Sequence, residues 1–387
     1  MSKAVLTART GKYVAHLLVR RDEVLAPLPE EEEVAYALYL AARSRSRRGP
    51  LKDLRVALVT RVYYSFIVKR FRGDHSLVFD PYRESVYRIT LHALDKSFID
   101  HILKTPEHRG PEGFPEKLSL VERAVREMLE TEKYVEIEEY SVKGLVGDQQ
   151  VVRELSLLLE HRVDYRLPGL RLGFKKPRVE ESVSAVNEVV DRVAETIGYV
   201  TMAIGELSRL ASLWERKLLE SREQASGEAG VEDVLKSTYK RLELVKTMLL
   251  ALSDRAKKAE KQVMSVVIPT PAGGEGLYWI PVYLVAYSTE SEEIAESRII
   301  PPVAVTPASR GRGVEVEVFK GIGRYLKSIE NLAEDPAYSD WVVELNLLRR
   351  IPVSTIEKSL YKLLEKALIE ERDVERIAES IATEQIE

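Results

Sequence analysis

The sequence contains no cysteine, and this absence excludes three kinds of chemistry. Disulfide bonds, thiolate metal ligands and cysteine nucleophiles are ruled out, so a metal site would need histidine and carboxylate ligands. The chain also has no apolar run close to the ~20 residues of a membrane-spanning helix. Basic residues interrupt the first 25 positions, which argues against a secretory signal peptide. We therefore expect a cytoplasmic protein that does not contact a membrane.

Side-chain amides are the second scarcity: 3 Asn and 5 Gln occur among 387 residues, whereas 31% of the chain is charged. Few thermolabile side chains beside many Glu, Lys and Arg are typical of a hyperthermophile protein. The length and the hydrophobic content of 45% suffice for two compact domains and an extended element.

Negative charge dominates the chain as a whole, but not its beginning. The net charge is −4, yet residues 1–110 hold 20 of the 58 Lys and Arg and only 13 of the 62 Asp and Glu. This region therefore carries +7 and the remainder −11. If the protein binds a polyanion, we expect it to bind at the N-terminal region.

Two stretches have apolar residues at alternating spacings of 3 and 4, from Val183 to Leu218 and from Leu235 to Val263. Helices with this pattern bury the apolar seam by supercoiling around a partner. The short segment Ser226–Gly230 between them predicts an antiparallel coiled-coil hairpin that stands out from a globular body. The predicted interface residues are Val190, Ile197, Ile204, Leu207, Trp214, Leu242, Leu249 and Leu252.

The rest of the chain predicts an α+β fold: a mixed globular body formed by the N- and C-terminal parts, with the hairpin inserted and a helical C-terminal tail. Helices are predicted at 34–42, 92–104, 117–131 and 148–160, and strands at 13–20 (a pair), 55–71, 76–79, 86–90, 134–140, 264–269, 277–287, 303–305 and 314–319. The predicted domains are a basic α+β domain (1–178), the hairpin (179–264), a small β-rich domain (265–339) and a helical segment (340–387).

A cluster of basic residues near the end of the first helix predicts a nucleic-acid site. Closely spaced cations release counterions from a phosphate backbone, and neighbouring aromatic rings can stack on bases. The alternative is a solvated helix end whose arginines complement the helix dipole and pair with Glu30 to Glu33. The candidate residues are Arg43, Arg45, Arg47, Arg48, Lys52, Arg55, Arg70 and Arg72, with Tyr63 and Tyr64 as stacking faces.

Two further segments suggest binding motifs. Residues 340–350 and 354–369 have the spacing of a helix-turn-helix, with Ser354 and Glu357 placed as a capping box, although the second helix is poor in basic residues. The segment Lys320–Arg324 contains a G-x-G sequence but lacks the third glycine of a dinucleotide fingerprint. Both are weaker signals than the hairpin.

Catalytic patterns are sparse. The 6 histidines show no metal-ligand spacing, and we find no nucleophile elbow and no phosphate-binding loop. A hydrolase or nuclease would have to use Asp74, His75 and Asp80 on the aromatic β-hairpin. The sequence therefore predicts no cofactor, no metal and no catalytic residue of a recognised kind.

Three functional hypotheses follow. The first is a non-enzymatic architectural or assembly protein that uses the coiled-coil hairpin for self-association or for docking a protein partner. The second is a nucleic-acid-binding protein that uses the cluster from Arg43 to Arg55 and the aromatic hairpin. The third is a hydrolase or nuclease of unrecognised geometry. The hairpin is the most regular feature of the sequence, so the first hypothesis is favoured.

Overall fold

The computed structural model describes residues 11–47, 54–95, 97, 113–131, 135–174, 178–224, 231–289, 294–309, 313–374 and 377. The chain forms two compact units. Unit 1 contains residues 1–84, 144–177 and 266–387, and unit 2 contains residues 85–143 and 178–265. The predicted α+β class is confirmed, with the two ends of the chain in one body and the helical hairpin inserted between them in the sequence.

The centre of unit 1 is a long antiparallel pair of strands, β4 (Arg55–Arg70) and β11 (Gly276–Ser288). Both strands are rich in Val, Ile, Tyr and Phe, which pack well in a pleated sheet. β5 (His75–Phe79) pairs with β4 through the predicted turn, and β10 (Val267–Pro269) pairs with β5. The sheet is completed by β1 (Lys12–Val14) and β12 (Ile294–Ile300) beside β11, β8 (Arg162–Val163) beside β1, and β9 (Leu170–Arg171) beside β4.

A second, four-stranded sheet in unit 1 has the order β14-β13-β2-β3. β2 and β3 form a hairpin whose two turn residues, Asp22 and Glu23, have φ of 45° and 69°, the backbone twist that a tight β-hairpin requires. The predicted strand pair at 13–20 is thus wrong in its pairing, because β1 and β2 belong to different sheets. The four strands are β2 (Leu17–Arg21), β3 (Val24–Pro27), β13 (Val303–Thr306) and β14 (Glu315–Val318).

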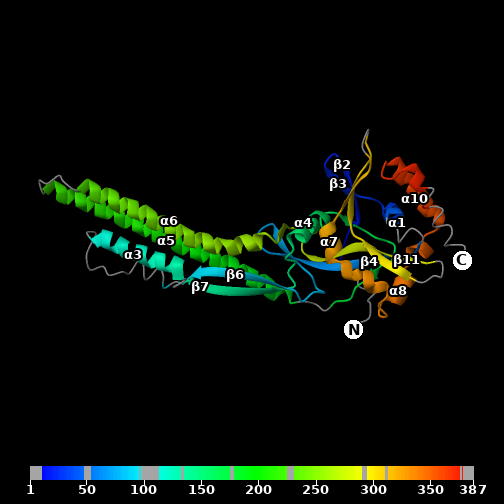
Figure 1. Ribbon diagram of the computed structural model, residues 1–387, viewed down its shortest axis with the longest axis horizontal. Coiled ribbons are helices and arrows are strands. Elements are labelled where there is room, and N and C mark those ends of the chain that lie inside the picture. The colour runs from blue at the N-terminus through cyan, green and yellow to red at the C-terminus, as the bar shows by residue number, and fades with distance from the viewer. Residues whose placement is uncertain are drawn as a thin grey trace. The chain divides into compact units, whose positions relative to one another are not determined.

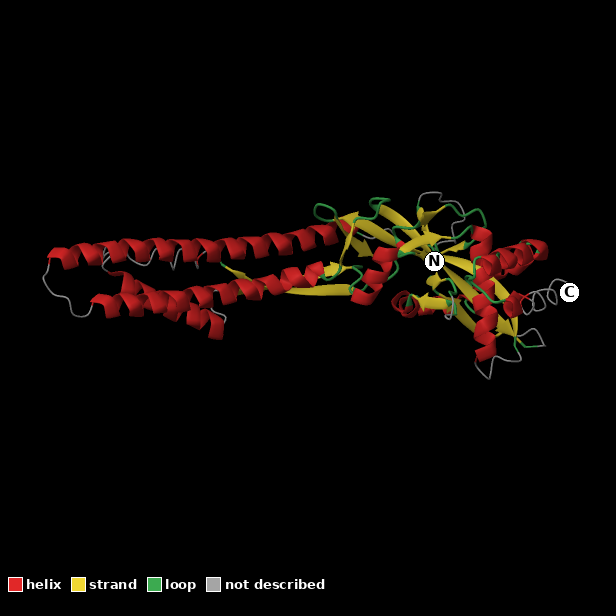
Figure 2. Ribbon diagram, turned by 90° about the horizontal axis from the view of Figure 1, so that it is seen from above, coloured by secondary structure: helices red, strands yellow, loops and turns green. Residues whose placement is uncertain are grey.

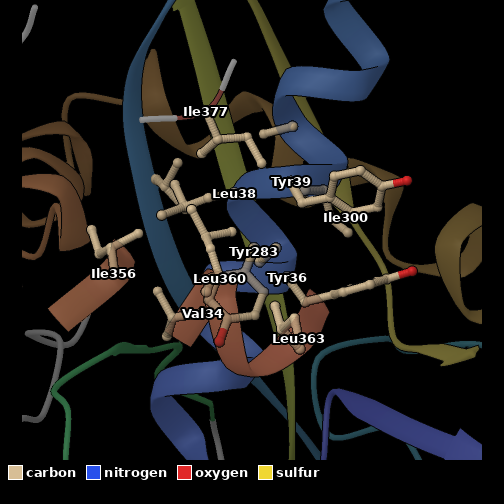
Figure 3. Packing of buried hydrophobic residues seen from close by; sticks show 14 of the residues in the cluster. Val34, Tyr36, Leu38, Tyr39, Tyr283, Ile300, Ile356, Leu360, Leu363 and Ile377 are labelled. Atoms are coloured by element: carbon tan, nitrogen blue, oxygen red, sulfur yellow. The ribbon is translucent and has the colours of Figure 1, made fainter. Parts of the chain in front are cut away.

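Helices α1 (Glu30–Arg47) and α10 (Val353–Glu365) pack against each other and bury apolar side chains together with β11. Figure 3 shows this core, with Tyr36 of α1 and Leu360 and Leu363 of α10 near Tyr283. Further helices described in unit 1 are α4 (Gln149–Leu158), α7 (Lys320–Tyr325), the 3₁₀ helix η3 (Lys327–Ala333), α8 (Ser339–Glu344) and α9 (Leu347–Arg350).

Unit 2 is built on the hairpin of α5 (Val179–Gln224) and α6 (Val231–Met264), which lie along each other (Figure 1). At 1.5 Å per residue the two helices are about 69 Å and about 51 Å long. Helix α3 (Phe114–Thr131) and the antiparallel strands β6 (Val86–Leu94) and β7 (Val135–Lys143) also pack on the hairpin, as the red and yellow ribbons of Figure 2 show. Among the described residues, no helix is both long and apolar enough to cross a membrane.

Two predicted helices are corrected. The start of the helix predicted at 92–104 is the end of β6, where His92 to Leu94 pair with β7, and residues 98–104 lie outside the described part. The helix predicted at 340–350 is broken into α8 and α9 at Leu345 and Asn346. The Asn346 side chain causes this break, because its Oδ1 caps α9 by accepting the N–H of Leu348 at 3.1 Å and also accepts the N–H of Val59 at 3.1 Å.

Candidate functional site

The hairpin is held by a continuous buried seam. On α6 the seam follows the predicted series, from Thr238 to Val263. On α5, Val190, Leu207 and Trp214 are buried, as predicted, whereas Ile197 and Ile204 are half-buried. The remaining predicted interface residues, Leu242, Leu249 and Leu252 of α6, are at most 2% exposed.

The buried positions on α5 are shifted because α5 has more than one partner. Thr196 and Ala203 are only 1% and 0% exposed, and they take the places expected for their neighbours Ile197 and Ile204. Thr196 Oγ1 accepts the backbone N–H of Leu94 in β6 at 3.2 Å. Phe114 of α3 places its ring centroid 5.9 Å from that of Trp214. The predicted two-helix coiled coil is therefore incomplete: α3 makes a third helix of the bundle and shares its core.

The outer face of α5 carries a second row of residues at spacings of 3 and 4, which we call the outer row. All of its side chains and glycines are exposed, and Met202 at its middle is 58% exposed. The outer row is recognised in the sequence by the order of its charged residues. It contains few apolar residues, so apolar periodicity does not reveal it. The outer row consists of Glu188, Asp191, Glu195, Gly198, Met202, Gly205, Arg209, Ser212 and Arg216.

The outer row is acidic toward the start of α5 and basic toward its end. Glu195 accepts a hydrogen bond from Arg192 at 2.6 Å, and Arg209 binds Glu206 at 2.6 Å and thereby lowers the pKa of that carboxyl. The exposed pair of Arg209 and Glu206 contributes little and exchanges readily for other partners, whereas Arg192 also pairs with Glu136 and Glu138 of β7. The acidic end also borders a hollow of about 490 Å³, which is lined by Ser184, Asn187, Glu188, Asp191, Arg192 and Glu195.

The residues of the predicted nucleic-acid cluster that the structure describes lie in separate places. Arg43 lies on α1 and donates to the Tyr39 hydroxyl at 2.6 Å, and Arg55 and Arg70 are exposed at the two ends of β4, with Arg72 in the following turn. Arg48 and Lys52 lie outside the described residues, as do the side chains of Arg45 and Arg47. The stacking role proposed for Tyr63 and Tyr64 does not fit their positions, because these residues are only 2% and 4% exposed. The nucleic-acid hypothesis thus loses these two stacking faces and keeps its basic residues.

Glu30, Glu32 and Glu33 pair with basic residues outside the cluster that the sequence suggests. Arg61 on β4 is 0% exposed, and its Nη1 lies 2.5 Å from Glu30 Oε1 while its Nη2 lies 3.5 Å from Glu33 Oε1. Glu32 pairs with Lys366 instead. The first turn of α1 is therefore fastened to the central sheet by a buried ionic network, which apolar and basic periodicities do not predict.

The network is completed by tyrosines and by His16. Tyr283, which pairs in register with Arg61, donates to Glu33 Oε1 at 2.7 Å, and Tyr165 donates to Glu33 Oε2 at 2.7 Å. Burial raises the pKa of both tyrosines, so they remain neutral donors. His16 contributes its backbone N–H to Glu33 Oε2 at 3.1 Å, and its Nε2 lies 3.0 Å from the Ile300 carbonyl. All of these bonds satisfy buried groups, which is the role of a structural network.

The G-x-G segment is not open to a phosphate group at its backbone amides. Gly321 and Ile322 donate their N–H groups to the two carboxylate oxygens of Glu154, at 3.0 and 2.7 Å. An anion already held by the chain therefore occupies the position that a nucleotide phosphate would take.

The three residues considered for hydrolysis do not converge. Asp74, in the turn before β5, and His75, the first residue of β5, are exposed, whereas Asp80 is buried just beyond the other end of this strand, about 16 Å from His75 at 3.3 Å per residue. Asp80 Oδ2 accepts hydrogen bonds from the hydroxyls of Tyr64 at 2.8 Å and Tyr325 at 2.7 Å. Its carboxylate thus has a structural function in joining β4 to α7.

The predicted helix-turn-helix is built into the core of unit 1. Ile356, Leu360 and Leu363 of α10 pack in the same apolar cluster as α1. The predicted capping box is wrong, because Pro352 is the N-cap of α10 and no side chain caps it. The exposed residues Lys358, Tyr361 and Lys362 remain on the opposite face.

Within the described part of the chain, no three His, Asp or Glu side chains gather closely enough to hold a metal ion. Comparison with known proteins gives no assignment: no protein-family model, no curated protein and no solved structure matches this chain. The candidate functional surface is the exposed outer face of the hairpin.

Proposed function

We propose that this protein is a non-enzymatic assembly protein that self-associates through the hairpin of unit 2. The observation that carries the proposal is the location of exposed apolar side chains. Of the large hydrophobic residues that are exposed, six lie on the hairpin and are between 40% and 58% exposed: Met202, Leu219, Val234, Leu244, Leu250 and Met264. They lie on helices whose inner faces are already satisfied by a complete buried core.

Helix geometry supports this proposal. A helix needs only one apolar face to pack in its own domain, and the opposite face is normally charged. On α5 the stretch from Gly198 to Gly205 exposes Thr201 and Met202 and no charged side chain. In a chain with 31% charged residues, such a gap favours contact with another protein surface over contact with water alone.

The test is sedimentation velocity of the full-length chain over a range of about 1 to 200 µM, a range that covers weak and transient association. We expect a concentration-dependent species of twice the chain mass of 44.0 kDa. Lysine cross-linking of that species should give intermolecular links within residues 179–264. A chain that stays monomeric over the whole range, or cross-links confined to unit 1, would refute the proposal.

A further inference from the structure

The order of charges along the outer row identifies both the partner and its orientation. At seven-residue spacing α5 presents Glu188, Glu195, Met202, Arg209 and Arg216. This order is antisymmetric about Met202: each acidic residue on one side corresponds to a basic residue at the same distance on the other. We propose that α5 pairs with α5 of a second copy of this chain, antiparallel, about a two-fold axis at Met202. This inference rests on the proposed function and specifies its interface.

The antiparallel orientation follows from the rise of the helix. Since each residue advances about 1.5 Å along the axis, two residues that are equally far from Met202 lie level across the pair. Glu195 then faces Arg209 and Glu188 faces Arg216, and each pairing occurs twice because the interface is isologous. A parallel pair would instead place Glu195 against its own copy and Arg209 against its own copy. Like charges at such positions disfavour association.

The middle of the outer row suits a close approach of two helices. Gly198 and Gly205 flank Met202 on the exposed face, and nothing lies within 4 Å of the Cβ that a side chain would add at either glycine. Neither glycine is therefore needed for packing within the chain, although each costs about 1 kcal/mol relative to alanine inside a helix. In the pair, the absent side chains leave room for the two Met202 side chains, which become buried at the axis.

The acidic end of the row can receive the basic end of the partner. The hollow of about 490 Å³ beside Glu188, Asp191 and Glu195 lies where the antiparallel pair places the partner's Arg209 and Arg216. Arginine binds carboxylates through two parallel N–H bonds, so these contacts are directional as well as attractive. Arg209 pairs with Glu206 of its own helix, and this exposed pair gives way at little cost. Arg192, which pairs with Glu195, is also held by Glu136 and Glu138 of β7.

The deciding experiment is charge exchange between two full-length variants, followed by sedimentation velocity. The acidic variant carries R209E and R216E, and the basic variant carries E188R and E195R. Each variant alone should self-associate at least about tenfold more weakly than the wild type, because every cross-helix pair becomes repulsive. An equimolar mixture should form a heterodimer. A matched control, K240E with K258E on the exposed side of α6, makes the same charge change as the acidic variant and should leave association unaltered.

Engineered thiols test the orientation, since the chain has no cysteine of its own. Under mild oxidation M202C should form a disulfide-linked dimer, because position 202 lies on the axis. S212C should not, because its two copies would be about 30 Å apart along the axis in an antiparallel pair. Equal cross-linking of both variants would indicate a parallel pair and overturn the inference.

The outcomes separate this inference from the proposed function. If the wild type associates but both charge variants associate equally well, the interface lies on another face and only the α5 pairing fails. If the wild type does not associate at all, the proposed function and this inference fail together.

Discussion

The buried network around Arg61 makes a quantitative prediction about stability. We expect R61M to lower the free energy of unfolding of unit 1 by about 3–5 kcal/mol, because removing one partner leaves buried carboxylates without their counter-charge. The variant loses the contact of 2.5 Å with Glu30 and the hydrogen bonds to Tyr283 at 2.9 and 3.2 Å. Methionine fills much of the space that the arginine stem occupied, so a cavity contributes little to the loss.

Guanidinium unfolding followed by tryptophan fluorescence measures this loss. Trp279 and Trp341 belong to unit 1 and Trp214 to unit 2, so a W214F background reports on unit 1. The matched control is R20M, which breaks the ion pair with Glu317 at 2.8 Å, where the side chains are 43% and 58% exposed. That change should cost less than about 1 kcal/mol.

A second substitution distinguishes a lost charge pair from a general packing defect. E33Q in the R61M background neutralises one of the stranded carboxylates. With its amide oxygen in the place of Oε2, the glutamine still accepts from Tyr165 and from the His16 N–H, and its NH2 group donates to the Tyr283 hydroxyl. We expect the double variant to be more stable than R61M alone, since contacting residues in one network are not additive. Equal losses for R61M and R20M, or strictly additive effects of R61M and E33Q, would refute the reasoning.

Three further predictions concern single residues. Burial lowers the pKa of His16 below its usual 6.5, so the unfolded state binds a proton at a higher pH than the folded state does. The free energy of unfolding should therefore fall as the pH falls below about 6.5, by at most ~1.4 kcal/mol per pH unit. H16Q should flatten this slope in unfolding curves between pH 7.5 and 5, and an unchanged slope would mean that other groups cause it. L249A, at a position that is 0% exposed, should cost about 2–5 kcal/mol and expose α6 to proteolysis, whereas L250A beside it, 51% exposed, should cost little. N346A should cost about 1–2 kcal/mol, because it removes the cap of α9 and leaves the Val59 N–H unsatisfied, as thermal unfolding would show.

Periodicity predicted the hairpin well because its signal is local and repeated. The seam of α6 follows the apolar series from Thr238 to Val263, and the shared body of the two chain ends follows from the geometry of a hairpin. Short strands were harder to pair. β1 and β2 are separated by only two residues, but β1 pairs with β11 and β2 pairs with β13. Nothing in the sequence of either short strand indicates its distant partner.

The sequence also does not predict the buried polar network around Arg61, because the residues of this network are far apart in the chain. Glu30 and Glu33 have the sequence signature of a helix N-terminus, and that interpretation is correct but incomplete. Only the packing of α1 on the sheet brings them to Arg61, 31 and 28 residues away in the chain. A sequence pattern relates residues that are only a few positions apart, so it does not connect Arg61 with Glu30 or Glu33. In the sequence, Arg61 looks like any other charged residue of a strand.

On α5 the buried positions are Thr196 and Ala203, where the heptad pattern predicts Ile197 and Ile204. A third packing partner therefore changes which residues of a heptad are buried. In a two-helix coil the larger residue of each adjacent pair would occupy the seam, since it buries more apolar area. On α5 the smaller residue is buried because β6 and α3 approach the same helix, and Thr196 also offers an oxygen to the N–H of Leu94. The isoleucines then cover the edge of the bundle. The inner and lateral faces of α5 are committed to α6, α3 and the strands, whereas the outer row remains exposed. The charges that support the proposed interface lie on this exposed row, where hydrophobic periodicity gives no signal.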